Sequence, residues 1–137
     1  MKNLNLEIKS IKVSSVLNRN TREYGKKHLI DGNLETCWNS DQGSPQHIII
    51  DFNDPLCINK IEFTFQGGFV GKTAEIYAFE NENPLLLETV HPLDSNALQA
   101  FPLKNQKSFL RYKINFPAST DFYGRITLYS LSLLGPE

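Results

Sequence analysis

Apolar and polar residues alternate along several short stretches of this chain, and that alternation constrains its fold more than any other feature. In one stretch, Ile61, Phe63 and Phe65 share a face, and the residues between them are polar or charged. Successive side chains of a strand point to opposite faces, so a period of two indicates strands with one buried face. The same pattern predicts strands over residues 74–78, 110–116 and 126–134. In the second of these, the inward residues are expected to be Leu110, Tyr112, Ile114 and Phe116.

Turn-forming residues separate these stretches at short and fairly regular intervals. Clusters of Gly, Pro, Asn, Asp and Ser occupy residues 31–33, 42–45, 53–55, 67–68, 81–84 and 94–96,. A continuous apolar run over Ile48–Phe52 fits a central strand. The only helical structure we expect is one or two turns near residues 33–36. No change in composition divides the chain, so the pattern predicts one all-β domain over residues 1–137, folded as a sandwich or jelly roll.

Two ends of the chain resemble a known family. The pattern Asp31-Gly32-x-x-x-Thr36-x-Trp38-x-Ser40, followed by a strand that ends in Asp51-Phe52, resembles the discoidin domain, also called the coagulation factor V/VIII C-type domain. Residues 109–114 and 126–135 are similar to that family's last two strands. The resemblance implies a galactose-binding-like jelly-roll β-sandwich. The sole tryptophan, Trp38, is expected to be a buried anchor.

A narrower resemblance implies a function. Residues 14–22, 25–29, 35–43, 65–69 and 120–125 are similar to a small family of stand-alone discoidin-like proteins described as associating with a testicular orphan nuclear receptor and repressing its activity. This implies a non-catalytic protein-binding module, acting as a nuclear receptor-associated transcriptional repressor in the nucleus and cytoplasm. The first ten residues contain no signal-peptide-like apolar run, and Cys37 and Cys57 are expected to be reduced, which fits that location. The partner itself does not transfer with the fold.

The binding residues are expected on loops at one end of the sandwich. Aromatic and arginine side chains dominate binding hot spots, and loops on a rigid scaffold commonly carry them. The predicted binding set is Arg19, Arg22, Gln66, Phe69, Phe122, Tyr123 and Arg125. For any one of these residues the alternative is a structural role, with Phe122 or Tyr123 turned into the core.

A structural calcium ion is a second candidate feature. The discoidin resemblance implies a site at Asp31, Asn33 and Thr36, completed in the family by a glutamate from the closing strand. Ser130 stands at that last position here. Calcium requires about six to eight oxygen ligands. We therefore expect no cofactor and a loop closed by its own hydrogen bonds, with calcium as the alternative.

Several other function classes find little support. Gly67-Gly68-Phe69-Val70-Gly71-Lys72-Thr73 contains the end of a phosphate-binding loop, but Gln66 stands where its first glycine would be,. The three histidines lack metal-ligand spacing, and no serine or cysteine has a nucleophile signature. The net charge of −1 argues against direct nucleic-acid binding and against adhesion to anionic membranes,. We expect no enzymatic activity.

A carbohydrate-binding module remains the alternative function. The family resemblance implies that domains of this fold often bind sugars with the same loops, through an aromatic face and polar side chains. A sugar ligand would therefore use the same candidate residues as a protein partner.

Overall fold

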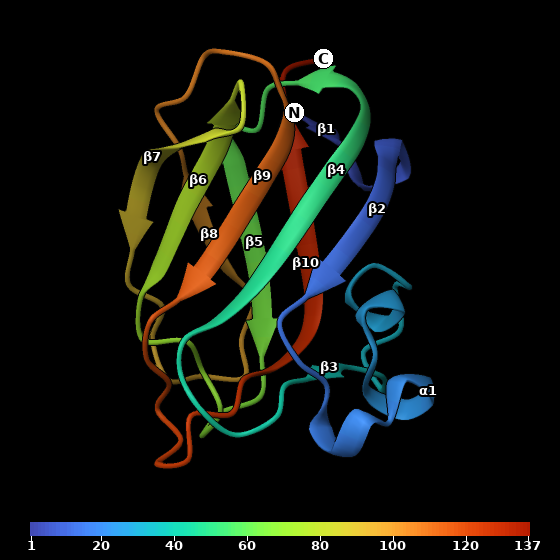
Figure 1. Cartoon of the computed structure of the whole chain (residues 1–137), viewed down its shortest axis with the longest axis vertical. Helices are drawn as coiled ribbons and strands as arrows, with labels where there is room; N and C mark the ends of the chain where they lie inside the picture. Colours follow the sequence, from blue (N-terminus) through green and yellow to red (C-terminus); the bar gives the residue numbers. More distant parts are fainter.

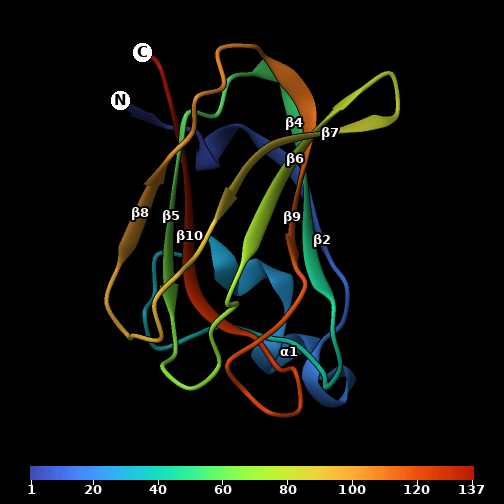
Figure 2. The same cartoon turned by 90° about the vertical axis from the view of Figure 1, so that its left-hand side faces the viewer.

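Two antiparallel sheets face each other in the computed structural model, which describes residues 1–137 (Figure 1). One sheet has the order β1-β10-β5-β8, with β3 paired to the start of β10; its strands are β1 (Lys2–Asn3), β3 (Trp38–Asn39), β5 (Lys60–Phe65), β8 (Gln99–Pro102) and β10 (Thr127–Gly135). The other has the order β2-β4-β9-β6-β7, with β2 (Ile8–Val13), β4 (Gln46–Leu56), β6 (Ala74–Glu80), β7 (Asn83–Val90) and β9 (Phe109–Phe116). Figure 2 shows the two layers edge-on. The jelly-roll β-sandwich predicted from the alternation is confirmed.

The core lies between the sheets because the alternating residues point inward. Ile61, Phe63 and Phe65 of β5 are at most 1% exposed, and Ala74, Ile76 and Ala78 of β6 are fully buried. β4 lies between β2 and β9, as the apolar run over Ile48–Phe52 predicts. Trp38 is fully buried, and its indole N–H donates to the Ser15 carbonyl at 2.9 Å. The expected tryptophan anchor is therefore present, with its polar atom satisfied.

The start of β9 departs from the predicted alternation. Phe109 is 7% exposed and Leu110 is 50% exposed, so the inward residue is one position earlier than expected. The pairing of β4 with β9 moves from Asp51 opposite Arg111 to Leu56 opposite Phe109. Extra residues on one strand twist the pair locally, which changes the face that a side chain meets. The prediction that Leu110 faces inward is wrong for this reason.

The residues predicted as a turn at 53–55 belong to the same irregularity. Asn53, Asp54 and Pro55 lie within β4 as exposed extended residues that no residue of β9 opposes. Turn-forming residues are also frequent at bulges, where a ladder hydrogen bond is already missing. The sequence signal therefore marks an interruption of the sheet and not a reversal of the chain.

The helical turns lie earlier in the chain than expected. They are the 3₁₀ turns Asn5–Glu7, Leu17–Arg19 and Lys26–Leu29 and the single-turn helix α1 (Thr21–Tyr24), whereas residues 33–36 form no helix. The Asn20 side chain caps α1 by accepting the Glu23 N–H at 3.2 Å. Segments this short do not develop a helical apolar period, so periodicity could not reveal them.

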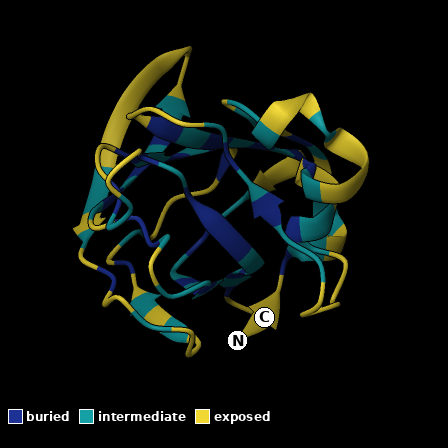
Figure 3. Ribbon diagram, turned by 90° about the horizontal axis from the view of Figure 1, so that it is seen from below, coloured by how far each residue is buried: buried dark blue, intermediate teal, exposed yellow.

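Several connecting loops lie together at the end of the sandwich away from the chain termini (Figure 1). We call this end the loop end. It contains the helical segment 17–29 and the loops at 40–45, 66–73 and 117–126. Figure 3 views the molecule from below, with buried strand residues ringed by exposed loops and helical turns. The structure contains no helix with the length and apolar character needed to cross a membrane.

Candidate functional site

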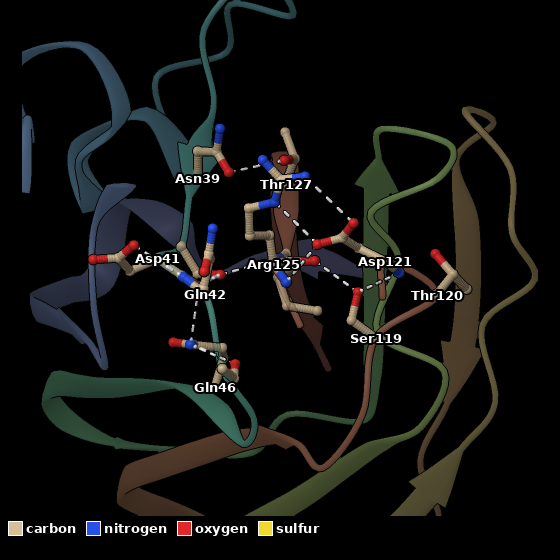
Figure 4. Close-up of polar contacts among 12 residues, drawn as sticks. Asn39, Asp41, Gln42, Gln46, Ser119, Thr120, Asp121, Arg125 and Thr127 are labelled. Carbon is tan, nitrogen blue, oxygen red and sulfur yellow. Dashed lines mark hydrogen bonds and ion pairs between the residues drawn. The ribbon is translucent and has the colours of Figure 1, made fainter. Parts of the chain in front are cut away.

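Arg125 is the centre of the candidate site at the loop end. It follows Gly124 and lies two residues before β10 begins at Thr127. Its Nε donates to Asp121 Oδ2 at 3.0 Å and its Nη2 donates to Asp121 Oδ1 at 3.4 Å (Figure 4). The backbone N–H of Arg125 also donates to Asp121 Oδ2, at 3.1 Å. A two-point contact of this kind holds the planar guanidinium in one orientation.

Two aromatic rings lie close to that guanidinium. Its Cζ lies 5.0 Å from the centroid of Phe69 and 5.8 Å from that of Tyr123. Phe122 packs edge-on against Tyr123, with centroids 5.3 Å apart. Phe122 is 93% exposed and Tyr123 is 56% exposed. The alternative in which either ring turns into the core is therefore wrong, and the loop end presents two aromatic side chains beside a positioned cation.

Backbone hydrogen bonds tie the loops of the site to one another. The Thr127 N–H donates to the Phe69 carbonyl at 3.0 Å, and the Gly43 N–H donates to the Tyr123 carbonyl at 2.7 Å. Gly124 has φ +84°, and an added Cβ there would lie 2.8 Å from the Gly43 carbonyl group. Only glycine fits this close approach. The site is therefore assembled from three loops and held as one unit.

Polar residues that sequence reasoning missed support this unit. Ser119 Oγ donates to the Arg125 carbonyl at 2.6 Å and accepts the Asp121 N–H at 3.0 Å. Gln46 is 5% exposed; its amide group donates to the Gly43 carbonyl at 2.8 Å and its oxygen accepts the Ser15 hydroxyl at 2.7 Å. The four-residue spacing of Asp121 and Arg125 is the one sequence signal that could have identified a member of this network.

The ion pair at the centre shifts the acidity of both its partners. The hydrogen bond from Arg125 lowers the pKa of Asp121 below its usual value, and the charge of Arg125 and the backbone donors reinforce this. The hydrogen bond to Asp121 raises the pKa of Arg125. Asp121 is therefore ionised at neutral pH, and Arg125 remains charged beneath the rings.

The predicted binding residues divide into two groups. Gln66 and Phe69 share a loop, the Gln66 N–H donates to the Thr127 carbonyl at 2.9 Å, and this loop meets the one that carries Phe122, Tyr123 and Arg125. The other two members, the exposed Arg19 and Arg22, lie on the helical segment and make no ion pair. That any of the seven residues binds a ligand stays a prediction.

The glycine turn does not present the apolar tip that a membrane-binding loop would need. Val70 is fully buried and Phe69 is partly buried against Arg125. The turn joins β5 to β6, and its Gly67 and Gly68 N–H groups donate to Asn96 and Asp94. No helix follows it, so the phosphate-loop reading finds no support in the geometry,.

The candidate calcium residues lie together and are hydrogen-bonded within their own loop. The carboxylate of Asp31 accepts the Asn33 N–H at 2.9 Å, the Thr36 hydroxyl, and His28 Nδ1 at 3.0 Å. The Asn33 side-chain oxygen accepts the Glu35 N–H at 2.9 Å. Burial works to raise the pKa of Asp31, but the hydrogen bonds from Thr36, Asn33 and His28 together lower it. Three residues whose oxygens are already engaged do not fit a calcium shell of about six to eight oxygens.

Comparison with known proteins assigns the fold to a family. Residues 10–84, more than half of the chain, match the F5/8 type C domain. The chain belongs to the F5/8 type C, or discoidin, domain family. The discoidin resemblance seen in the sequence is thereby confirmed.

The relatives of this discoidin protein carry one name. It is 42% identical over 127 residues to the nuclear receptor 2C2-associated protein of Danio rerio, covering 92% of this chain and 90% of that protein. It is also 42% identical over 127 residues to the nuclear receptor 2C2-associated protein of Homo sapiens, covering 92% and 91%. These relatives therefore match this chain over almost their full length.

A solved structure confirms the architecture. The fifth family 32 carbohydrate-binding module of a Clostridium perfringens protein, in complex with GalNAc-β-1,3-galactose, superposes with a TM-score of 0.81 at 18% identity, covering 98% of this chain and all of that one. The superposition shows that the two folds agree, and at this low identity it shows nothing about shared ligands. The sugar in that complex is a property of that protein.

Proposed function

We propose that this protein is a non-catalytic binding module that associates with a nuclear receptor through the loop end of its sandwich. The observation that carries the proposal is the 42% identity to nuclear receptor 2C2-associated proteins over 92% of the chain. An alignment of that extent leaves only about 8% of the chain unmatched. Nuclear receptor association is therefore the function that the relatives' names support best.

The surface chemistry of the loop end supports this proposal. Interface hot spots are enriched in tyrosine, tryptophan and arginine, and they need surface that a partner can cover. Phe122 and Tyr123 offer exposed ring surface, and Arg125 is already ordered by Asp121. A partner that covers the rings would lose little side-chain entropy from Arg125 because that side chain is already ordered.

Repression and location extend the proposal. A module that occupies a receptor surface can block the binding of another protein without touching DNA, and the net charge of −1 is typical of such a protein and not of a DNA reader,. We place the protein in the nucleus and cytoplasm, where its receptor would be. We assign it no enzymatic activity and no cofactor.

The test is direct binding to purified nuclear receptor 2C2 by biolayer interferometry. Three proteins are compared: wild type, Phe122→Ala/Tyr123→Ala, and Leu6→Ala, a control whose 95% exposed side chain matches the 93% exposed Phe122. We expect the double variant to bind at least about tenfold more weakly, as loss of hot-spot residues does, and the control to bind as wild type does. Equal binding by all three proteins would show that the interface lies outside the loop end. No binding by wild type would contradict the receptor association itself.

One observation favours a second candidate, a carbohydrate-binding module. Tyr123 is an exposed ring next to an ordered cation, and a sugar ring stacks on such a face while its hydroxyls bond to polar groups,. A glycan array probed with wild type and with Tyr123→Ala tests it. Saturable binding of a neutral sugar that Tyr123→Ala abolishes would favour this function, and an array without signal would remove it.

A further inference from the structure

The strongest unexplained feature is a basic groove beside β2, which shares no residue with the site around Arg125. It is an open groove of about 750 Å³, lined by residues of the edge strand β2, by Val16 and by residues of the helical turns at 21–27. Four cations line it: Lys12 from β2, and Arg22, Lys26 and Lys27 from the helical turns. No acidic residue is among the groove's lining residues.

None of these four cations has an ion-pair partner within the chain. All five ion pairs involve other residues, such as Arg111 with Asp51 and Arg125 with Asp121. The side chains are exposed, so each keeps its charge in water at little cost,. Lys12 is close enough to Asp51 for its charge to help lower the pKa of that carboxyl, but the two form no ion pair. Four cations without ion pairs around one depression create a local positive potential that attracts an anionic group.

The positive charge is concentrated in this part of the chain, although the whole protein has a net charge of −1. Residues 8–30 contain six of the chain's 14 lysines and arginines and one of its 15 carboxylates. That segment therefore carries a net charge of +5, and the remaining residues carry −6. A long polyanion such as duplex DNA would extend beyond the groove and meet this negative remainder. Charges separated by more than about 8 Å are screened at physiological salt, so a short anionic ligand gains the attraction without the repulsion.

The floor of the groove is apolar and firmly supported. Val13 and Val16 line it while they pack against the hydrophobic core. Gly25 forms part of the wall, and an added Cβ there would lie 2.2 Å from the Thr21 carbonyl oxygen. Glycine therefore allows the close backbone approach between residues 21 and 25 at this wall,. An apolar floor with a cationic rim matches a ligand that has one apolar group between negative charges.

We propose that this groove binds an acidic segment of a partner protein, with one aliphatic side chain on Val13 and Val16 and flanking carboxylates paired with Lys12, Arg22 and the two lysines at 26 and 27. The shape argues against a lipid surface, because membrane-binding loops protrude whereas this surface is concave,. The groove is a second interaction surface, and its existence does not depend on the receptor association proposed above.

The experiment selects peptides from a displayed library of short random sequences on the immobilised full-length chain. Three baits are used: wild type, Lys26→Glu/Lys27→Glu, and Lys104→Glu/Lys107→Glu. The last is a control with the same charge change on two exposed lysines outside the groove. Circular dichroism and thermal unfolding first establish that both variants fold as wild type does.

We expect the wild-type bait to enrich peptides that combine Asp or Glu with Leu, Ile or Val. In fluorescence anisotropy, the most enriched peptide should bind Lys26→Glu/Lys27→Glu at least about tenfold more weakly than wild type, because two attractions become repulsions, and the control should match wild type. Enriched peptides without acidic residues, or equal binding by the groove variant, would overturn the proposal. Tighter binding of a DNA duplex or of phosphatidylserine vesicles than of the peptide would also overturn it. None of these outcomes bears on nuclear receptor 2C2, which is absent from the assay.

Discussion

Arg125 and Arg22 look alike in the sequence, yet the structure assigns them different roles. Arg125 is held by Asp121 through two side-chain hydrogen bonds and lies against two aromatic rings. Arg22 has no ion-pair partner and lines the basic groove. At the scale of single residues, an arginine with an acidic partner in the chain has its charge neutralised inside the protein. An arginine without one keeps its charge available to a ligand.

The first prediction concerns the carboxylate that orients Arg125. Asp121→Asn should lower the free energy of unfolding by about 1 kcal/mol at neutral pH, because it removes a charge-assisted pair that is partly exposed. Arg125 holds the folded-state pKa of Asp121 below the usual 3.8. The contribution is therefore fully present above pH 3.8 and is lost as the pH falls through the lower folded-state value. Urea denaturation across this range should show the wild-type advantage shrinking in acid.

Asp54→Asn is the control for that measurement, since Asp54 is exposed and makes no ion pair. It should leave the free energy of unfolding nearly unchanged at neutral pH. An Asp121→Asn protein as stable as the control would show that the pair contributes no net stability.

The second prediction concerns the Asp31 loop. The carboxylate of Asp31 already accepts hydrogen bonds from Asn33, Thr36 and His28, so the loop should need no cation to close. The melting temperature should therefore be the same with millimolar calcium and with excess chelator. An increase with calcium that Asp31→Asn abolishes would restore the calcium alternative.

The β6–β7 hairpin shows how an element can carry local strain. Its turn residues Asn81 and Glu82 have φ of 50° and 69°, in the left-handed region. Both central residues of a type I′ turn require positive φ, which suits Asn followed by Gly. A non-glycine residue in this region costs roughly 1 kcal/mol. The edge strand β7 is therefore held by a turn whose second residue is not optimal.

The third prediction follows at this scale. Glu82→Gly should raise the free energy of unfolding by about 0.5–1 kcal/mol, because glycine relieves the strain at the second turn position. Glu80→Gly is the matched control at the last residue of β6, which pairs with Asn83, and it should lower stability, since glycine in a strand loses more conformational freedom on folding,. Thermal and urea unfolding of both variants would measure the difference. A less stable Glu82→Gly protein would mean that interactions of the Glu82 side chain outweigh the turn strain.

One side chain joins the two sheets where the chain crosses between them. Tyr112 of β9 is fully buried; its hydroxyl donates to the Leu56 carbonyl at 2.7 Å and accepts the Ile58 N–H at 3.2 Å. Leu56 ends β4 in one sheet, and β5 of the other sheet begins at Lys60. At the scale of the whole molecule, this hydroxyl satisfies two backbone groups where the chain passes from one sheet to the other,.

The fourth prediction uses the acidity of this hydroxyl. Desolvation by burial raises the pKa of Tyr112 from 10.0 to about 12. The folded protein therefore retains this proton more tightly than the unfolded chain does. Its contribution is fully present below pH 10.0 and is lost as the pH rises toward 12,.

Tyr112→Phe tests both parts of that argument. It should lower stability by about 1–3 kcal/mol at neutral pH, because two buried backbone groups lose their partner. It should also remove the part of the stability loss between pH 10 and 12 that Tyr112 causes. Absorbance titration of the tyrosines should show one fewer high-pH transition in the variant. A wild-type stability that stays constant over this range would contradict the assignment.

Alternation and turn chemistry were sufficient to predict the sandwich. A strand's period of two is visible in the local sequence, because every second side chain faces the buried side of the sheet. Ile61, Phe63 and Phe65 could be placed in the core from their spacing alone. The helical turns at 17–29 could not, because they are too short to show a period. The inward position of Phe109 depends on a bulge against β4, which no local pattern contains.

The sequence by itself determined the fold family, the buried Trp38, and the residue types available at the loop end. Only the tertiary structure decided which of those residues act together. It placed Phe69 beside Arg125 across 56 positions of sequence, left Phe122 exposed, and moved Arg22 to a separate groove. The physical reason is that strand burial is encoded in local spacing, whereas a site is formed by loops whose proximity depends on how two sheets pack.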